Sequence, residues 1–350
     1  MDFTLSETQV ELRDLADRII GDHASVERIR DVERGGEGID RDLWRALARA
    51  GILRAFGEAG GGVDVVDAAL VCEAHGRHVA PVPLWPTLAA LLALRDSPLP
   101  AVLDGDELVT VALAEPGQAL PGQGATLTGT KLSVPVAPVA RWVLVPVAEP
   151  EPALHLVDLT ESGVTVEHVT TTDRGLAGHL RLDGAPSVRV GDTAAVDRLL
   201  AVATVLVCAT HVGVCAEAVR RTAEYIATRE QFGRPLAAFQ GPVLRIADAH
   251  IDTEAMRVTT LQAAWRLETG RPAAEAVATA KWWAAEAGHR VVHATQHLHG
   301  GIGADVDYPI HRYFLWGKQL ADTLGGASAH AAELGRLLAA RTGRTERSAA

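Results

Sequence analysis

A chain of 350 residues is too long for one ordinary hydrophobic core, so we expect two or three packed units. Hydrophobic residues make up 48% of it, which is enough apolar surface for such cores. Its 33 basic and 44 acidic side chains give a formal net charge of −11, and no Lys or Arg run forms a stripe for phosphate backbones, which argues against a nucleic-acid partner.

The cysteines and the first residues bear on the compartment. Cys72, Cys208 and Cys215 lie in apolar surroundings without CxxC spacing, which predicts buried thiols in a reducing compartment rather than disulfides or a metal site. The start, Met1-Asp2-Phe3-Thr4, lacks the basic and apolar regions of a signal peptide. We therefore expect a cytoplasmic protein without a metal.

The N-terminal residues carry helix patterns. Ser6 and Gln9 form a capping box, which predicts a helix from Ser6 through Ile20. Further helices are expected over residues 40–50 and 65–78. Prolines then punctuate the exit from this helical region, at Pro81, Pro83 and Pro86.

From about residue 108 the pattern changes to short β-branched runs separated by Gly, Pro and acidic turns. The runs that predict strands are residues 109–114, 125–131, 142–147 and 154–157. We expect a small all-β barrel or sandwich that ends near Val190.

Helical patterns return at about residue 193. They predict four long helices, over residues 193–229, 236–268, 272–298 and 310–341, and the short connections between them favour an antiparallel bundle. The first helix contains an apolar stretch, residues 199–219, that is long enough to cross a bilayer. Because this stretch includes His211 and Glu217 and continues into an amphipathic segment, we expect a core helix and no membrane span.

The predicted fold class is therefore α+β, with three domains and a tail. The expected bounds are 1–107 for an N-terminal helical domain, 108–192 for a middle β domain, 193–342 for a C-terminal helical bundle and 343–350 for a disordered tail.

Two loops between the C-terminal helices carry the chemistry. The first is Arg229-Glu230-Gln231-Phe232-Gly233-Arg234-Pro235-Leu236, followed by Phe239-Gln240, a turn whose Arg and Gln donors beside an aromatic ring suit an anion next to a flat group. The second is His297-Leu298-His299-Gly300-Gly301-Ile302-Gly303, followed by Asp307-Tyr308-Pro309 and Arg312, in which bare glycine backbone allows close approach of a ligand.

This pair of loops, in this order and spacing, resembles the acyl-CoA dehydrogenase family, and the layout of helices, strands and helices resembles it across the whole chain. The resemblance implies an FAD enzyme whose ADP half is held by residues of a neighbouring subunit. The residues that match the ADP-binding positions are Arg229, Gln231, Phe232, Gly233, Gln240, His297, Gly300 and Gly301. The family usually has Gln where this chain has His297.

Positions that the family uses to hold the flavin ring differ here. Of the family's Thr-Glu-Pro-x-x-Gly-Ser-Asp stretch, residues 114–117 keep Ala-Glu-Pro-Gly, and residues 118–121 depart with Gln-Ala-Leu-Pro. Ser133 and Pro135 stand where the family has a Trp and a Thr. Neither can stack on the ring or replace those contacts.

The resemblance also requires a carboxylate base, because the family removes an α-proton while a hydride leaves for FAD. The two places where the family keeps this base hold Leu324 or Gly325 in one case and Ala203 in the other. Asp322 and Asp197 are the nearest alternatives. The catalytic residue is therefore left unassigned.

Intact ADP-side motifs beside vacant base positions resemble one subunit of the actinobacterial heteromeric acyl-CoA dehydrogenases that act on steroid side-chain CoA thioesters. That resemblance implies an α2β2 assembly with a homologous partner that carries the base, and an electron-transfer flavoprotein as acceptor. Two alternatives stay open. One is a self-sufficient homomeric enzyme with a relocated base, and the other is a structural subunit without flavin.

Overall fold

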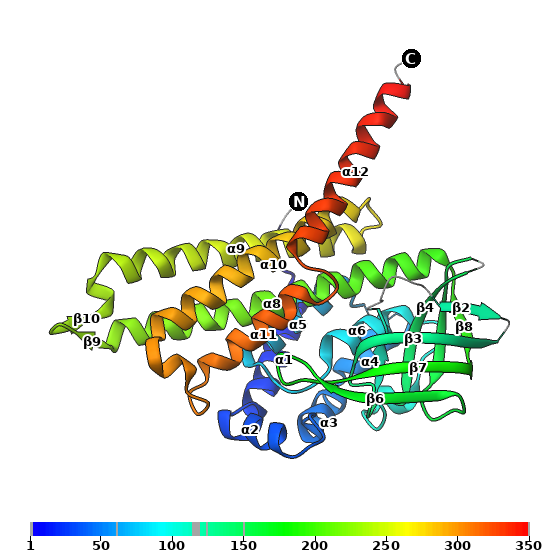
Figure 1. Ribbon diagram of the computed structural model, residues 1–350, viewed down its shortest axis with the longest axis horizontal. Coiled ribbons are helices and arrows are strands. Elements are labelled where there is room, and N and C mark those ends of the chain that lie inside the picture. Colours follow the sequence, from blue (N-terminus) through cyan, green and yellow to red (C-terminus); the bar gives the residue numbers. More distant parts are fainter. Residues whose placement is uncertain (1–2, 61, 114–119, 124, 150, 349–350) are drawn as a thin grey trace.

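The computed structural model describes residues 3–60, 62–113, 120–123, 125–149 and 151–348 (Figure 1). Helices form both ends of the chain and strands form the middle, which confirms the predicted class. The N-terminal helices are α1 (Glu7–His23), α2 (Val26–Arg34), α3 (Arg41–Arg49), α4 (Ile52–Gly57), α5 (Val65–His78), α6 (Leu84–Ala93) and α7 (Pro100–Leu103).

Local signals placed α1, α3 and α5. The predicted capping box is present at α1, where the Gln9 amide donates to Ser6 Oγ at 3.2 Å and the Ser6 amide donates to Gln9 Oε1 at 3.0 Å. The predictions for α3 and α5 are also confirmed. The exit after α5 differs, because α6 includes Pro86. Proline is tolerated in the first turn of a helix, where its missing N–H has no intrahelical partner.

The middle strands are β1 (Val109–Val111), β2 (Leu120–Gln123), β3 (Thr126–Pro135), β4 (Trp142–Glu149), β5 (Ala153–Asp158), β6 (Val164–Thr170), β7 (Leu176–Pro186) and β8 (Val188–Gly191). They follow the order β6-β7-β3-β2-β4-β5-β8, and β1 pairs in parallel with β4. Apolar side chains such as Val143, Val157 and Leu180 fill the core between them. Residues 114–119, which hold the retained Ala-Glu-Pro-Gly and the first two residues of the departure from the family stretch, lie outside the described residues.

The C-terminal elements are α8 (Thr193–Thr228), β9 (Glu230–Gln231), β10 (Arg234–Pro235), a 3-10 turn η1 (Leu236–Ala238), α9 (Gln240–Glu268), α10 (Ala274–His299), a second 3-10 turn η2 (Gly300–Ala304), α11 (Ile310–Asp322) and α12 (Ala327–Ser348). Helix α8 packs against α5, α9, α10 and α11. It is long and apolar enough to cross a membrane, yet 83% of its apolar window is buried inside the protein, as expected of a core helix. Cys72, Cys208 and Cys215 are free and buried.

Two glycines allow α5 and α8 to cross at very short range. A Cβ on Gly76 would lie 2.0 Å from the carbonyl oxygen of Thr210, and a Cβ on Gly213 would lie 2.0 Å from the carbonyl oxygen of Glu73. The backbone of each helix thus packs directly against a glycine of the other helix, where a side chain would not fit. This crossing joins the N-terminal helices to the C-terminal bundle.

The predicted helix over residues 310–341 is wrong in one respect, because it is broken between Asp322 and Ala327. Leu324 and Gly325 take positive φ values of 59° and 97°, which end α11 and redirect the chain. Helix α12 starts against α10 and then projects from the body (Figure 1). It continues to Ser348, so the segment predicted as a disordered tail is largely helical. That segment contains no proline and only one glycine, Gly343, to interrupt the hydrogen-bond ladder.

Candidate functional site

The first predicted loop is a two-residue β-hairpin at the far end of α8. Gln231 pairs with Arg234 across the turn, and Phe232 and Gly233 both have positive φ, 53° and 78°. Two central residues with positive φ match the twist of a tight hairpin. The Arg229 carbonyl accepts from the Leu236 amide at 2.8 Å, which closes the base of the hairpin.

The side chains of this hairpin are available to a ligand or another chain. Arg229, Gln231 and Gln240 are exposed, and Phe232 is 93% exposed. Arg234 is already used, because its guanidinium lies 4.0 Å over the ring of Phe239. Across the part of the chain that the structure describes, no ion pair engages Arg229. A helix-end salt bridge therefore does not account for this arginine.

The second predicted loop begins where α10 ends. Gly300 has φ 62°, and the space around the Cβ positions of Gly300 and Gly301 holds no other atom of the described chain within 4 Å. His297 is exposed on the last turn of α10. The glycines therefore form an open backbone surface, which suits close approach of an anion or a flat group.

Both loops lie at the same end of the bundle. Tyr225, one turn before Arg229 on α8, donates its hydroxyl to the carbonyl of His299 at 3.4 Å and stacks on the His299 ring at 4.3 Å. Figure 1 shows the hairpin β9-β10 and the end of α10 at this extremity, away from the strands. We call this end, residues 229–240 and 297–304, the tip.

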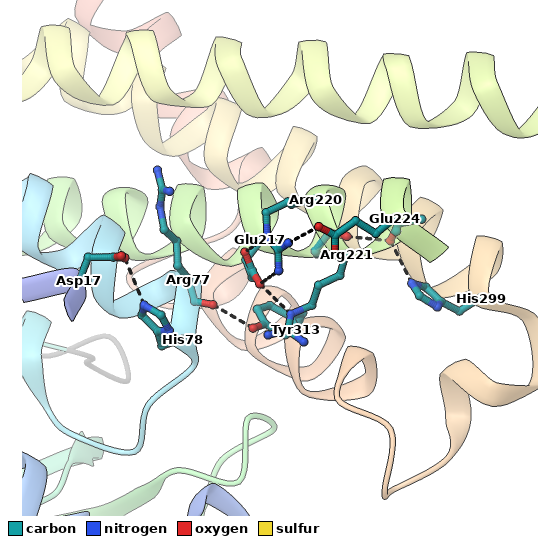
Figure 2. Close-up of polar contacts among 11 residues, drawn as sticks. Asp17, Arg77, His78, Glu217, Arg220, Arg221, Glu224, His299 and Tyr313 are labelled. Atoms are coloured by element: carbon teal, nitrogen blue, oxygen red, sulfur yellow. Dashed lines mark hydrogen bonds and ion pairs between the residues drawn. The ribbon is translucent and has the colours of Figure 1, made fainter. Parts of the chain in front are cut away.

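Arg220 and Arg221 of α8 are committed to ion pairs. Arg220 donates to Glu217 at 2.6 and 2.7 Å and to Glu224 at 2.5 Å, and Arg221 pairs with Glu217 at 2.8 Å (Figure 2). Burial would raise the pKa of Glu217, but Arg220 and Arg221 hold it below its ordinary value. This network braces the helix that leads to the tip, whereas Arg229, directly after its last residue, has no ion pair with any described residue.

A separate cavity of about 350 Å³ lies between the N-terminal helices, the strands and α11. Its wall is mostly apolar, with Trp85, Val111, Leu113, Trp316 and Leu320. Ser133 and Pro135, which the resemblance places at the family's ring-contact positions, also line it. Among the described residues that line this cavity, none belongs to the tip.

The positions that the resemblance assigns to the base fall in and near this region. Leu324 lines the cavity, and Ala203 is fully buried within α8. Asp322 lies at the cavity wall and is exposed, whereas Asp197 is exposed on α8 and does not line it. In the described segments, no group of three His, Cys, Asp or Glu side chains could hold a metal ion.

Two carboxylates of the cavity were not identified from the sequence. Asp173 lies 2.5 Å from the Thr171 hydroxyl and accepts from the Gly175 amide at 3.0 Å, and burial raises its pKa despite these contacts. Glu33, on α2, binds Arg312 of α11 at 2.9 and 3.0 Å and Arg174 of the β6-β7 turn at 3.4 Å. Glu33 thereby links three parts of the molecule, and only the fold brings them together.

The tip and the cavity are well separated. Gly76, next to the cavity residue His75, packs on Thr210 of α8. Arg229 follows Thr210 by 19 residues, which is roughly 30 Å along a helix. One small site in a single chain cannot include both.

Comparisons with known proteins agree with this architecture. The family model described as acyl-CoA dehydrogenase, C-terminal domain, matches residues 191–334. Acyl-CoA dehydrogenase FadE27 of Mycobacterium tuberculosis is 40% identical over 97% of this chain and 99% of its own length. Acyl-CoA dehydrogenase FadE28 of the same organism is 34% identical over 85% and 92%.

Solved structures give the same result. A variant of the Tcur3481-Tcur3483 steroid ACAD superimposes with a TM-score of 0.91 at 46% identity, covering 97% of this chain and 100% of that one. The ChsE4-ChsE5 complex from Mycobacterium tuberculosis gives 0.90 at 40% identity, covering 97% and 99%. The fold defines a dehydrogenase scaffold of two helical regions around a small sheet. This chain belongs to the acyl-CoA dehydrogenase family.

Proposed function

We propose that this chain is one subunit of a heteromeric, FAD-dependent acyl-CoA dehydrogenase. It supplies the contacts to the ADP half of FAD, and a homologous partner supplies the flavin-ring site and the base. The substrate class is a bulky acyl-CoA thioester such as a steroid side-chain derivative. Support comes from two solved structures of high coverage whose names join two proteins, the Tcur3481-Tcur3483 steroid ACAD and the ChsE4-ChsE5 complex.

The separation of the tip from the cavity carries this proposal. Arg229, Gln231, Gln240 and His297 of the tip are exposed, and Arg229 lies roughly 30 Å along α8 from the chain's own cavity. They therefore suit a cofactor whose ring lies in another chain. The cavity in turn offers Ser133 and Pro135 at the ring positions and Leu324 at a base position.

The residues at the tip fit an ADP group in their chemistry. Arg229 would pair with the pyrophosphate as a charge-assisted donor, and Gln231, Gln240 and His297 would donate hydrogen bonds. Gly300 and Gly301 leave room for a phosphate against the backbone, because a Cβ would occupy that space. FAD, when bound, accepts the hydride from the substrate.

Exposed apolar side chains near the tip support a partner chain. Val243, Leu244, Ile251 and Val258 are between 41% and 64% exposed and follow helical spacing along α9. Phe232 extends this surface at the hairpin. Contiguous exposed apolar side chains mark interaction surfaces.

The proposal includes the domain bounds 1–107, 108–192 and 193–342, a cytoplasmic location and an electron-transfer flavoprotein as acceptor.

The first experiment compares this chain alone with this chain co-expressed with a homologous acyl-CoA dehydrogenase chain. FAD per chain is measured from visible absorbance, and turnover is measured with acyl-CoA substrates. We expect little FAD and no turnover for the chain alone, and both for the complex. Normal turnover by the chain alone would contradict the proposal, and a complex without flavin would favour the structural-subunit alternative.

A matched pair of arginines tests the tip. In the complex, Arg229→Ala should weaken FAD binding by at least about tenfold, because a charge-assisted contact to the pyrophosphate is lost. Arg245→Ala removes an exposed arginine on α9 and should leave FAD binding unchanged. Equal FAD affinity in both variants would rule out the assigned role of Arg229.

A homomeric enzyme with a relocated base is the second candidate, and the carboxylates at the cavity favour it. Asp173 and Asp322 both line the cavity, and burial raises the pKa of Asp173. If the chain alone binds FAD and turns over, Asp173→Asn and Asp322→Asn should identify the base by a loss of several orders of magnitude in kcat. Unchanged turnover in both variants would exclude both residues.

A further inference from the structure

The Gly300–Gly301 turn is exposed, yet the residue before it is buried. His299, the last residue of α10, is 2% exposed and lies among Thr222, Tyr225 and Tyr308. Figure 2 shows its ring directed from the end of α10 toward α8. The backbone of His299 thus leads into the open turn while its side chain anchors in the bundle.

The hydrogen bonds around His299 determine where its proton lies. Thr222 donates its hydroxyl to the Ala218 carbonyl at 2.7 Å, so its oxygen is left to accept from His299 Nε2–H at 3.2 Å. Nδ1 then carries the lone pair, and it accepts from the Tyr308 hydroxyl at 3.1 Å. Burial lowers the pKa of His299 to about 4, which keeps the ring neutral at pH 7 as this arrangement requires.

Two further contacts fix the backbone on either side of the turn. Tyr225 stacks on the His299 ring at 4.3 Å and donates to the His299 carbonyl at 3.4 Å. Gln296, on the same last turn of α10, donates to the Gly303 carbonyl at 2.6 Å. The turn is therefore held at its start by the His299 cluster and at its end by Gln296 and Tyr308.

We propose that His299 is a positioning residue that presets the Gly300–Gly301 turn for the cofactor's diphosphate, acting through Thr222, Tyr225 and Tyr308 without touching the ligand. This inference rests on the proposed function of the tip. A site that is ordered before binding avoids the entropic cost of ordering the loop in the complex. An exposed turn with two glycines would otherwise sample many conformations.

The test uses the complex of this chain with its homologous partner, stripped of flavin and titrated with FAD. His299→Leu removes both ring hydrogen bonds, and Tyr308→Phe removes only the donor to Nδ1. We expect Tyr308→Phe to raise the Kd for FAD about tenfold, which corresponds to the loss of one good hydrogen bond, and His299→Leu to raise it at least as much. His299→Gln, which keeps one donor and one acceptor, should recover most of the affinity. His293→Gln, an exposed histidine on the same helix, should leave it unchanged.

A second measurement separates positioning from general destabilisation. Hydrogen exchange of the amides of residues 300–307, in this chain alone, should speed up in His299→Leu and Tyr308→Phe while exchange in the middle of α8 stays slow. The double variant should show a Kd close to that of His299→Leu, because that substitution already breaks the contact with Tyr308. A wild-type Kd in His299→Leu, or exchange that rises equally in α8, would overturn the proposal. If the wild-type complex binds no FAD, the proposed function itself fails.

Discussion

Glycines serve opposite purposes in two regions of this molecule. At the crossing of α5 and α8, Gly76 and Gly213 meet the backbone of the facing helix where a Cβ would lie 2.0 Å from a carbonyl oxygen. At the tip, Gly300 and Gly301 face open space. The first pair lets two helices pack, and the second pair leaves room for something outside the chain. A glycine's role therefore depends on what faces it.

The largest expected effect tests this comparison directly. Gly213→Ala should destabilise the fold by at least about 3 kcal/mol, because the two helices must move apart to admit a methyl group. Gly301→Ala should change the free energy of unfolding by less than about 0.5 kcal/mol, because its methyl group meets no atom and its φ is not positive. Urea unfolding measures both. A similar decrease in the free energy of unfolding in both variants would refute the distinction between packed and open glycines.

A somewhat smaller effect is expected at the junction of Glu33. Glu33→Gln leaves Arg312, whose side chain is 4% exposed, without its counter-ion, which should cost roughly 2–3 kcal/mol. Glu333→Gln breaks an exposed pair with Arg336 on α12 and should cost almost nothing.

The Glu33 effect should also depend on pH. Burial would raise the pKa of Glu33, but Arg312 and Arg174 hold it below 4.5. A carboxyl with a lowered folded-state pKa stabilises the fold above its ordinary pKa, and the contribution is lost as the pH falls further. The difference between wild type and Glu33→Gln should therefore shrink below pH 4.5. A difference that stays constant down to the acid transition would contradict this assignment.

A third prediction concerns His211, which is buried on α8 with both ring nitrogens unpaired among the described residues. Burial, with the charges of Lys281 and His289, lowers its pKa to about 3. The neutral ring is favoured in the fold, so stability is fully present above pH 6.5 and is lost as the pH falls toward 3.

His211→Leu should therefore raise the free energy of unfolding by about 1 kcal/mol at pH 7.5 and flatten its decline between pH 6.5 and the acid transition. Unfolding in urea at several pH values provides the measurement. Parallel stability curves for wild type and variant would show that His211 does not titrate on unfolding.

The smallest effect on stability is expected at the tip. Phe232 is 93% exposed, so Phe232→Ser should change the free energy of unfolding by less than about 0.5 kcal/mol. The variant chain should nevertheless associate more weakly with the partner, because the interface would lose an aromatic side chain that becomes buried in the complex. Thermal unfolding of the chain alone and sedimentation of the complex measure the two quantities. If Phe232→Ser lowered the free energy of unfolding but left association with the partner unchanged, Phe232 would act as a core residue and not as an interface residue.

Local signals predicted much of the fold. The capping box at Ser6 placed the start of α1, and the hydrophobic periods placed α5 and α8. Helix α2 was missed, although Ser25 accepts from the Arg28 amide as an N-cap and such a residue can be read from sequence. The break after Asp322 was missed as well, because Leu324 adopts a positive φ that its residue type does not suggest.

The candidate site divides in the same way. The residues of the tip are close together in sequence, within two loops, and were identified as two motifs. Of the carboxylates at the cavity, Asp322 was named from the sequence as an alternative base, whereas Glu33 and Asp173 were not, since they come from two segments distant from it and from each other. Spacing along the sequence does not predict that side chains from such distant segments line one cavity.

The sequence by itself determined the order of helices and strands, the family resemblance, the glycine-rich tip and the vacant base positions, because each depends on residues near one another in the chain. Only the tertiary structure decided that the tip lies far from the chain's own cavity, that Glu33 joins Arg174 to Arg312, and that His299 anchors the Gly300–Gly301 turn. Those facts depend on long-range packing, in which buried polar groups find partners that sequence proximity does not provide.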